Sequence, residues 1–307
     1  MKRVFPILAV LSALLLGYAF YEAMWVAPME RTMGDVQRIF YYHVPSAWTA
    51  FLLFFINFLA SLQFLVRAKA STLRTANWIV IGVGVLGAVA PFVPQVQTQL
   101  PEGLYPSSVS TTAVMMAALY FLIGKYFRGR SLDVLAVTTA EVGVVFCTVV
   151  LVTGPIWARP VWGIWWTWDI RLTTTLVLWL IYVSYLVLRR FSDSAQTPKL
   201  AAVLAIFGAL DVPLVYFSIW FFRTQHPQPV IGGGGSIDPR MMHVLLINWL
   251  AFSCLAFLVC WARYRLEWLQ REVEETQALE SLLGDADTAR APAKIPYSKI
   301  ASQSRSR

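Results

Sequence analysis

The chain has 307 residues, of which 58% are hydrophobic and only 14% are charged, and its mean hydropathy is +0.60. Soluble domains carry roughly 25% charged residues, so this deficit excludes a large soluble core and indicates a polytopic membrane protein. The formal charge of +8 comes from basic residues in short loops and in the tail, which indicates membrane orientation and no nucleic-acid binding.

Eight apolar runs are long enough to cross about 30 Å of hydrocarbon. They cover residues 5–26, 45–66, 75–97, 110–127, 134–155, 171–191, 200–222 and 242–262. The first run imitates a signal peptide, but no small-x-small cleavage site ends it, so we interpret it as a retained helix. The sequence therefore predicts an all-α bundle of about eight spans, with a transmembrane domain over residues 1–262. Gly154-Pro155 is predicted to end the fifth span.

Basic residues gather in alternate loops, and this bias predicts the orientation of the spans. The loops after the second, fourth, sixth and eighth spans are basic, as is the N-terminus, so we expect both termini in the cytoplasm. The other loops, 27–44, 98–109, 156–170 and 223–241, are then expected to face outward. Residues 263–283 place Leu266, Leu269, Val273 and Leu283 near heptad spacing, which predicts a cytoplasmic amphipathic helix that either pairs with a partner subunit or lies solvated. Residues 284–307 are polar and are predicted to be disordered.

One outward segment packs four tryptophans into seven positions and follows them with an acid and a base: Trp162, Trp165, Trp166, Trp168, Asp169 and Arg171. Tryptophans at a membrane boundary are commonly anchors, and an acid–base pair is commonly a surface salt bridge. If the segment is helical, however, its spacing of i, i+3 and i+4 makes one continuous indole face that Asp169 extends. Such a face suits a large, flat, amphipathic ligand.

All three histidines, His43, His226 and His243, fall on the outward side. A lone histidine at a helix mouth is more often a structural group, but two histidines from separate loops can approach a planar macrocycle from opposite faces. Imidazole is the usual axial ligand of haem iron. The combination predicts haem bound between His43 and His226, with His243 as the alternative second ligand. Arg159 and Arg171, which flank the tryptophans, are the expected partners of the haem propionates.

Other polar groups inside the runs carry weaker signals. Glu141 and Asp211 lie within spans, where a helix-packing hydrogen bond is favoured over a functional role, and Asp211 with Pro213 indicates a local kink. Three cysteines within apolar runs form no CxxC pair, so a disulfide framework or a zinc site is poorly supported.

The pattern Trp162-Gly163-x-Trp165-Trp166-x-Trp168-Asp169-x-Arg171-Leu172-Thr173 resembles the "WWD" signature of the haem-handling proteins of bacterial cytochrome c maturation. His43, in a His-Val-Pro setting, and His226 match the flanking histidines of that family. The Asp-x-Arg-Leu-Thr ending and the stretch 236–239 resemble its CcmC branch. The synthase branches continue Trp-Asp-Pro, whereas Ile170 stands here.

The resemblance implies a bacterial inner-membrane protein that presents haem b at the periplasmic face, with His43 and His226 as axial ligands and the tryptophans as platform. It implies transfer to the haem chaperone CcmE, alongside the ABC components CcmA and CcmB and the small protein CcmD, with no catalysis by this chain. A cytochrome c synthase, a transmembrane haem transporter and an electron-transfer cytochrome are the alternatives. The chain departs from the six-helix family core by an extra hairpin at about 75–127 and by its long charged tail.

Overall fold

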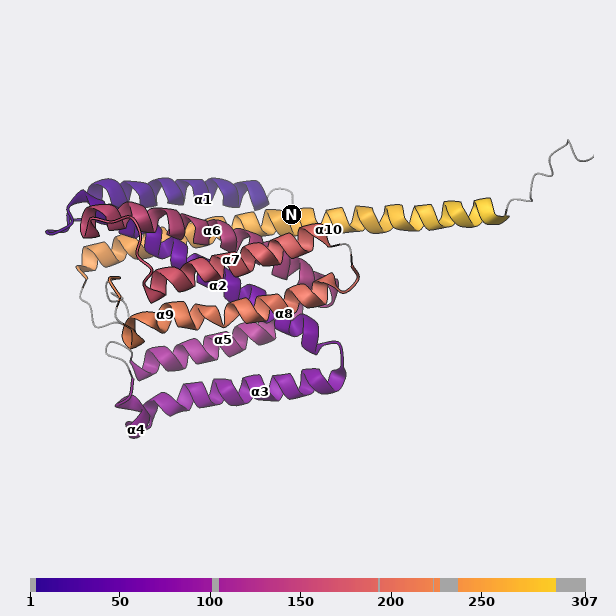
Figure 1. Ribbon diagram of the computed structural model, residues 1–307, viewed down its shortest axis with the longest axis horizontal. Coiled ribbons are helices and arrows are strands. Elements are labelled where there is room, and N and C mark those ends of the chain that lie inside the picture. The colour runs from indigo at the N-terminus through magenta and orange to yellow at the C-terminus, as the bar shows by residue number, and fades with distance from the viewer. Residues whose placement is uncertain (1–3, 101–104, 193, 223, 227–236, 291–307) are drawn as a thin grey trace, which may run out of the picture. The chain divides into compact units, whose positions relative to one another are not determined.

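The computed structural model describes residues 4–100, 105–192, 194–222, 224–226 and 237–290 (Figure 1). Apart from one isolated bridge between Glu30 and Gly34, the regular elements of these residues are all helices. The chain divides into two compact units, Met1–Tyr264 and Arg265–Arg307. The predicted all-α class is confirmed.

Eight helical segments in the described ranges are long and apolar enough to cross a membrane: Val4–Val26, Asp35–Val66, Ala70–Phe92, Pro106–Tyr126, Arg130–Trp162, Ile170–Phe191, Thr197–Phe221 and Pro239–Ser281. This confirms the number of spans that the apolar runs predict. The helices are α1 (Val4–Tyr21), α2 (Phe40–Val66), α3 (Ala70–Val89), α4 (Pro94–Gln97), α5 (Pro106–Tyr126), α6 (Arg130–Trp162), α7 (Ile170–Phe191), α8 (Thr197–Ala209), α9 (Asp211–Phe221) and α10 (Pro239–Arg290). A π-helical turn, Glu22–Val26, extends α1, and short 3-10 segments cover Asp35–Ile39 and Ala90–Phe92.

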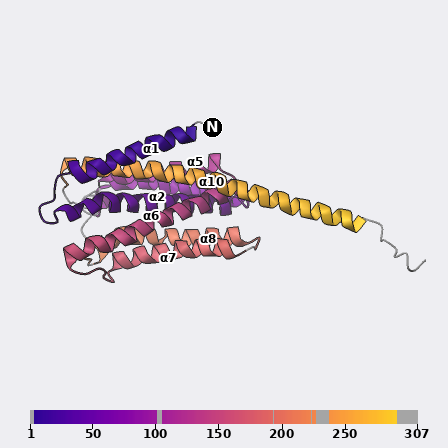
Figure 2. The same cartoon turned by 90° about the horizontal axis from the view of Figure 1, so that it is seen from above.

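Helices α2 and α6 form the centre of the first unit, between α1 on one side and α7 with α8 on the other (Figure 2). More than half of each of these two spans is buried, against a third or less of the remaining spans. In the core, the ring of Phe54 stacks on Tyr182 with centroids 3.8 Å apart. Gly143 of α6 admits that ring, because a Cβ atom there would lie 2.6 Å from Phe54 Cε1.

The extra hairpin consists of α3 and α5, with α5 lying between α3 and the rest of the bundle (Figure 1). Glycines bring the two helices close together, since a Cβ on Gly87 would lie 2.6 Å from the Cβ of Ala113. Helix α5 is attached to α2 by Arg67, whose Nη2 donates to the Gly124 carbonyl at 2.5 Å. Helix α3 has no buried residue, so its apolar surface suits contact with lipid.

Two predicted boundaries in the α2 and α6 spans are wrong. Helix α2 begins at Phe40, so His43 lies in its first turns and not in a loop before residue 45. Helix α6 continues past Gly154-Pro155 to Trp162. Proline is tolerated inside a membrane helix where neighbouring groups compensate for the lost hydrogen bond, and Pro155 lines a cavity.

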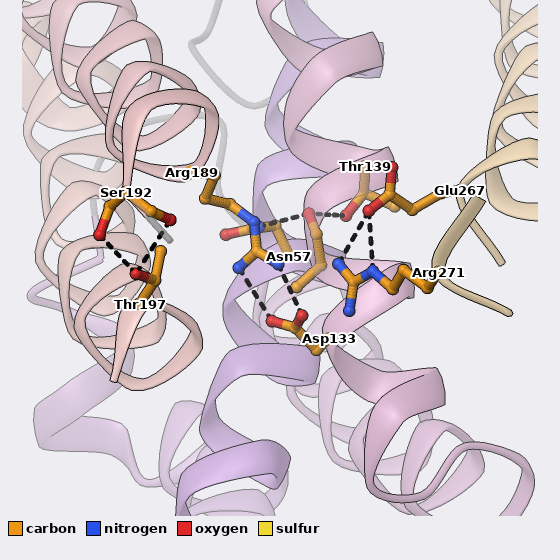
Figure 3. A network of polar contacts seen from close by, with 9 residues as sticks. Asn57, Asp133, Thr139, Arg189, Ser192, Thr197, Glu267 and Arg271 are labelled. Atoms are coloured by element: carbon orange, nitrogen blue, oxygen red, sulfur yellow. Dashed lines mark hydrogen bonds and ion pairs between the residues drawn. The ribbon is translucent and has the colours of Figure 1, made fainter. Parts of the chain in front are cut away.

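Helix α10 continues further along the chain than the sequence predicts. Residues after 283 are predicted to be disordered, but the helix continues to Arg290. No proline occurs in the sequence between Gly284 and Pro292, and alanine, leucine and arginine favour helix. Glu267 and Arg271 form an i, i+4 ion pair at 2.9 Å within it (Figure 3). Residues 291–307 of the expected tail lie outside the described residues.

At the end of the bundle opposite the tryptophans, a polar network joins α6 and α7 (Figure 3). Two nitrogens of Arg189 donate to the two carboxylate oxygens of Asp133 at 2.8 and 2.6 Å. Beside this pair, Asn57 Nδ2 donates to the Ala136 carbonyl at 2.7 Å, which ties α2 to α6. The Asp133 carboxylate, the Arg189 guanidinium and the Asn57 amide nitrogen are therefore hydrogen-bonded, as burial of polar groups favours, whereas the Asn57 amide oxygen has no partner among the described residues.

The two acids within spans differ in their partners. Glu141 forms a bidentate ion pair with Arg263 at 2.8 Å, which joins α6 to α10. Asp211 is buried, and its Oδ2 has no hydrogen-bond partner among the described residues. The expected kink is present, because the chain leaves the helix at Leu210, between α8 and α9, just before Asp211 and Pro213.

Candidate functional site

A cavity of about 320 Å³ lies toward the end of the bundle that carries the tryptophans. Its volume falls within the range of roughly 300–1,000 Å³ that is typical of small-molecule sites. Helices α2, α6, α7 and α9 form its walls, and residues 32–33 and 225–226 contribute from two connecting segments. The lining is mostly apolar, with a few polar side chains near the tryptophan end.

His43 and His226, which are far apart in the sequence, both line this cavity. The His43 side chain is 9% exposed, and its Nδ1 lies 2.9 Å from the hydroxyl oxygen of Thr153. That hydroxyl donates its own hydrogen to the Val149 carbonyl at 2.7 Å. The Thr153 oxygen therefore accepts from His43, so Nδ1 carries the proton and Nε2 carries the lone pair that a metal ion needs.

Gly154 lies beside the His43 ring. A Cβ atom at Gly154 would lie 3.5 Å from His43 Cε1, which is an ordinary contact. Trp157 packs on the ring edge-to-face, with centroids 5.9 Å apart. The ring is thus fixed by a hydrogen bond and an aromatic contact on α6.

Thr224 connects the segment that carries His226 to the tryptophan segment. The Thr224 hydroxyl donates to Asp169 Oδ2 at 2.8 Å, and the His226 backbone N–H donates to the same hydroxyl at 3.1 Å. Asp169 also caps α7, because its Oδ1 accepts from the Leu172 backbone N–H at 3.0 Å. The third histidine, His243, is exposed on α10 and is not among the residues that line the cavity.

The tryptophan segment is not the helix that its spacing allows. Gly163 has φ +79°, a left-handed conformation that ends α6 after Trp162, and residues 163–169 form a non-helical connection to α7. The expected continuous indole face is therefore wrong. We call residues 162–169 the tryptophan loop. Trp162 and Trp166 line the cavity, whereas Trp165 and Trp168 are 58% and 76% exposed.

The two arginines beside the loop occupy different places. Arg171 lines the cavity, and its buried Nη1 has no hydrogen-bond partner among the described residues. The indole Nε1 of Trp166 is likewise buried without a described partner. Arg159 is exposed, lies outside the cavity lining, and donates to the Gly163 carbonyl. Buried donors without acceptors suit an anionic or polar group on a ligand.

The cavity also includes residues that sequence reasoning did not single out. Thr32 and Met33 reach it from a turn that Glu30 organises, because the Glu30 carboxylate accepts from the Thr32 hydroxyl at 2.6 Å and from the Met33 N–H at 2.5 Å. These hydrogen bonds hold the pKa of Glu30 below its ordinary value. Among the lining residues of α6, Cys147 is the furthest along the helix from Trp162. None of these residues belongs to a sequence motif that could have identified it.

Comparisons with known proteins relate this chain to one protein family. The sequence model of the CcmC family, described as "Heme exporter protein C", matches residues 105–279. "Heme exporter protein C" of Bradyrhizobium diazoefficiens is 28% identical over 282 residues, which cover 91% of this chain and 84% of the relative. The protein of the same name from Escherichia coli is 34% identical over 149 residues, 48% of this chain and 59% of the relative.

A "Putative cytochrome c biosynthesis ccmC-like mitochondrial protein" of Arabidopsis thaliana is 26% identical over 273 residues, 87% of this chain and 81% of the relative. The family match extends over more than half of the chain and includes the tryptophan loop and His226. The sequence match therefore covers the residues that form the tryptophan loop at one end of this multi-pass bundle. The chain belongs to the CcmC family of haem exporter proteins, and its role lies in haem handling for cytochrome c maturation.

Proposed function

We propose that this protein binds haem b between His43 and His226, at the outer face of the bacterial inner membrane, and presents it to the chaperone CcmE. The observation that carries the proposal is that these two histidines line one cavity together with Trp162, Trp166 and Arg171. Imidazole is the usual axial ligand of haem iron, and an apolar cavity with a few polar groups suits a porphyrin.

Each wall of the cavity has a distinct part in this proposal. His43 offers Nε2 to the iron, because Thr153 holds the proton on Nδ1. Trp162 and Trp166 cover the macrocycle, and the free guanidinium nitrogen of Arg171 pairs with a propionate. Arg159, which supports the loop through Gly163, is the second candidate cation for the propionates. The His43 and His226 imidazoles would hold the iron, and two such ligands would favour its low-spin, oxidised state.

The exposed tryptophans are the proposed contact surface for the chaperone. Trp165 and Trp168 lie outside the cavity lining and are mostly exposed, so they suit contact with CcmE at the membrane surface. The chain acts by binding and transfer without catalysis of its own. The ABC components CcmA and CcmB supply energy for release, and CcmD completes the complex. Both termini lie in the cytoplasm, so the tryptophan loop faces the periplasm.

Absorption spectra of the purified protein with bound haem test the ligand set. Alanine at His43 or at His226 is expected to abolish the six-coordinate low-spin spectrum, whereas His243→Ala, on the exposed surface of α10, is expected to retain it. The opposite result, with loss at His243 and none at His226, contradicts the proposal.

Two further experiments separate the alternative functions. A cytochrome c synthase would attach haem to a co-expressed apocytochrome without the other components, and we expect no attachment. A transmembrane transporter would accumulate haem inside sealed vesicles that contain only this chain, and we expect haem to remain at the surface.

A further inference from the structure

Thr224 connects two parts of the site that are distant in the sequence. Its hydroxyl donates to Asp169 Oδ2 at 2.8 Å and accepts from the His226 backbone N–H at 3.1 Å. The single hydroxyl therefore uses both its donor and one of its acceptor positions. One of these bonds reaches the tryptophan loop, and the other fixes the backbone of the residue that carries the second imidazole.

Asp169 gives this connection a rigid base. Its Oδ1 accepts from the Leu172 N–H at 3.0 Å, which makes it the N-cap of α7, while Oδ2 accepts from Thr224. The carboxylate is thus committed to a helix end on one side and to the His226 segment on the other. A hydrogen bond to a carboxylate is roughly twice as strong as one between neutral groups. Of the two hydrogen bonds that the Thr224 hydroxyl makes, the one to Asp169 is therefore the stronger.

The His226 segment has little regular structure to hold it. Helix α9 ends at Phe221, and the described residues that follow it, 222 and 224–226, are neither helix nor strand. A ligand must be held within about 0.5 Å of its working position by groups that are themselves fixed. Thr224 supplies such a group, because it sits two residues before the histidine and binds a capped helix end.

We propose that Thr224 is a positioning residue for the second haem ligand: through Asp169 it fixes His226 relative to the tryptophan loop. This inference rests on the proposed function, because it takes His226 as an iron ligand. It also assigns Asp169 a role in holding the site together, in place of direct contact with haem.

The test compares variants of the full chain, purified with haem. Thr224→Val keeps the shape of the side chain and removes both hydrogen bonds, whereas Thr224→Ser keeps the hydroxyl. Thr174→Val is the matched control, because the Thr174 hydroxyl bonds only to carbonyls of its own helix, Ile170 and Arg171, among the described contacts. His226→Ala is measured beside them. Thr224→Ala replaces the valine variant if size-exclusion chromatography shows that the latter is aggregated.

Thr224→Val is expected to shift the spectrum toward five-coordinate, high-spin haem. It is also expected to raise the rate of haem loss to excess apomyoglobin about tenfold, which corresponds to about 1.4 kcal/mol. Thr224→Ser and Thr174→Val should match the unmodified protein. Added imidazole should restore the low-spin spectrum of Thr224→Val, because free imidazole replaces a displaced ligand but cannot repair a misfolded cavity.

The outcomes separate the two ideas. If His226→Ala changes the spectrum and Thr224→Val does not, the positioning role is wrong and the proposed function stands. A defect in Thr224→Val that Thr224→Ser shares, or that imidazole leaves unchanged, also overturns the positioning role. If His226→Ala itself leaves the spectrum unchanged, the proposed ligand set fails.

Discussion

The buried ion pair between Asp133 and Arg189 gives a sharp prediction about stability. Their side chains are 5% and 11% exposed, and two hydrogen bonds of 2.8 and 2.6 Å join them. Removing one partner of a buried pair leaves a charge without its bidentate partner and costs about 3–5 kcal/mol. We therefore expect Asp133→Ala to lower the free energy of unfolding by that amount.

Coulomb's law supports this magnitude. With an effective dielectric constant of about 20, two unit charges 4 Å apart attract by roughly 4 kcal/mol. Replacing both partners by apolar residues, as in Asp133→Leu with Arg189→Met, removes the stranded charge as well as the attraction. Such double replacements are often neutral, so the double variant should recover most of the stability that either single variant loses.

The assay is unfolding in mixed micelles titrated with SDS, followed by tryptophan fluorescence, for both single variants and the double variant. The resulting double-mutant cycle isolates the interaction between the two side chains. Asp238→Asn is the matched control, because Asp238 pairs with Arg240 at 3.1 Å on the exposed surface and should show no resolvable change. Equal effects of Asp133→Ala and Asp238→Asn, or a coupling energy below about 0.5 kcal/mol, would refute the reasoning.

Two glycines of α6 should respond differently to alanine. Gly143→Ala places a methyl group 2.6 Å from the buried ring of Phe54 and should lower the free energy of unfolding by about 1–3 kcal/mol. Gly154→Ala makes an ordinary 3.5 Å contact with His43, and the free energy of unfolding should change by no more than about 1 kcal/mol. The same unfolding titration measures both variants. Cys147 lines the cavity and the other two cysteines do not, so bound haem should slow its labelling by a membrane-permeant maleimide and leave theirs unchanged. Equal protection of all three thiols would place the haem elsewhere.

Hydropathy predicts the spans well because the bilayer sets their length and excludes unpaired backbone groups. All eight runs correspond to helices, including the short run at 110–127, which is α5. The boundaries are harder to predict because a local breaker signal does not decide the end of a helix by itself. Proline at position 155 was expected to end α6, but the helix ends where Gly163 takes a left-handed conformation.

The sequence singles out residues that the structure brings together, but it does not predict how they are arranged. The sequence identifies His43, His226 and Arg171, which line one cavity. It cannot show which tryptophans face inward, because that depends on the path of a non-helical loop. It also gives no signal for Thr224, whose importance comes from contact with a residue on another segment.

Helices α6 and α7 are joined at both ends, by Asp133 with Arg189 at one end and by the tryptophan loop at the other. That loop has a helix terminus at each of its own ends, Gly163 and the Asp169 cap. Because α6 and α7 are joined at both ends, widening the cavity between them requires breaking the Asp133–Arg189 pair or rearranging the tryptophan loop. On another side of the cavity, the segment that follows α9 contacts Asp169 and the His226 backbone through the Thr224 hydroxyl, so loss of this hydroxyl frees that contact without disturbing either connection between α6 and α7.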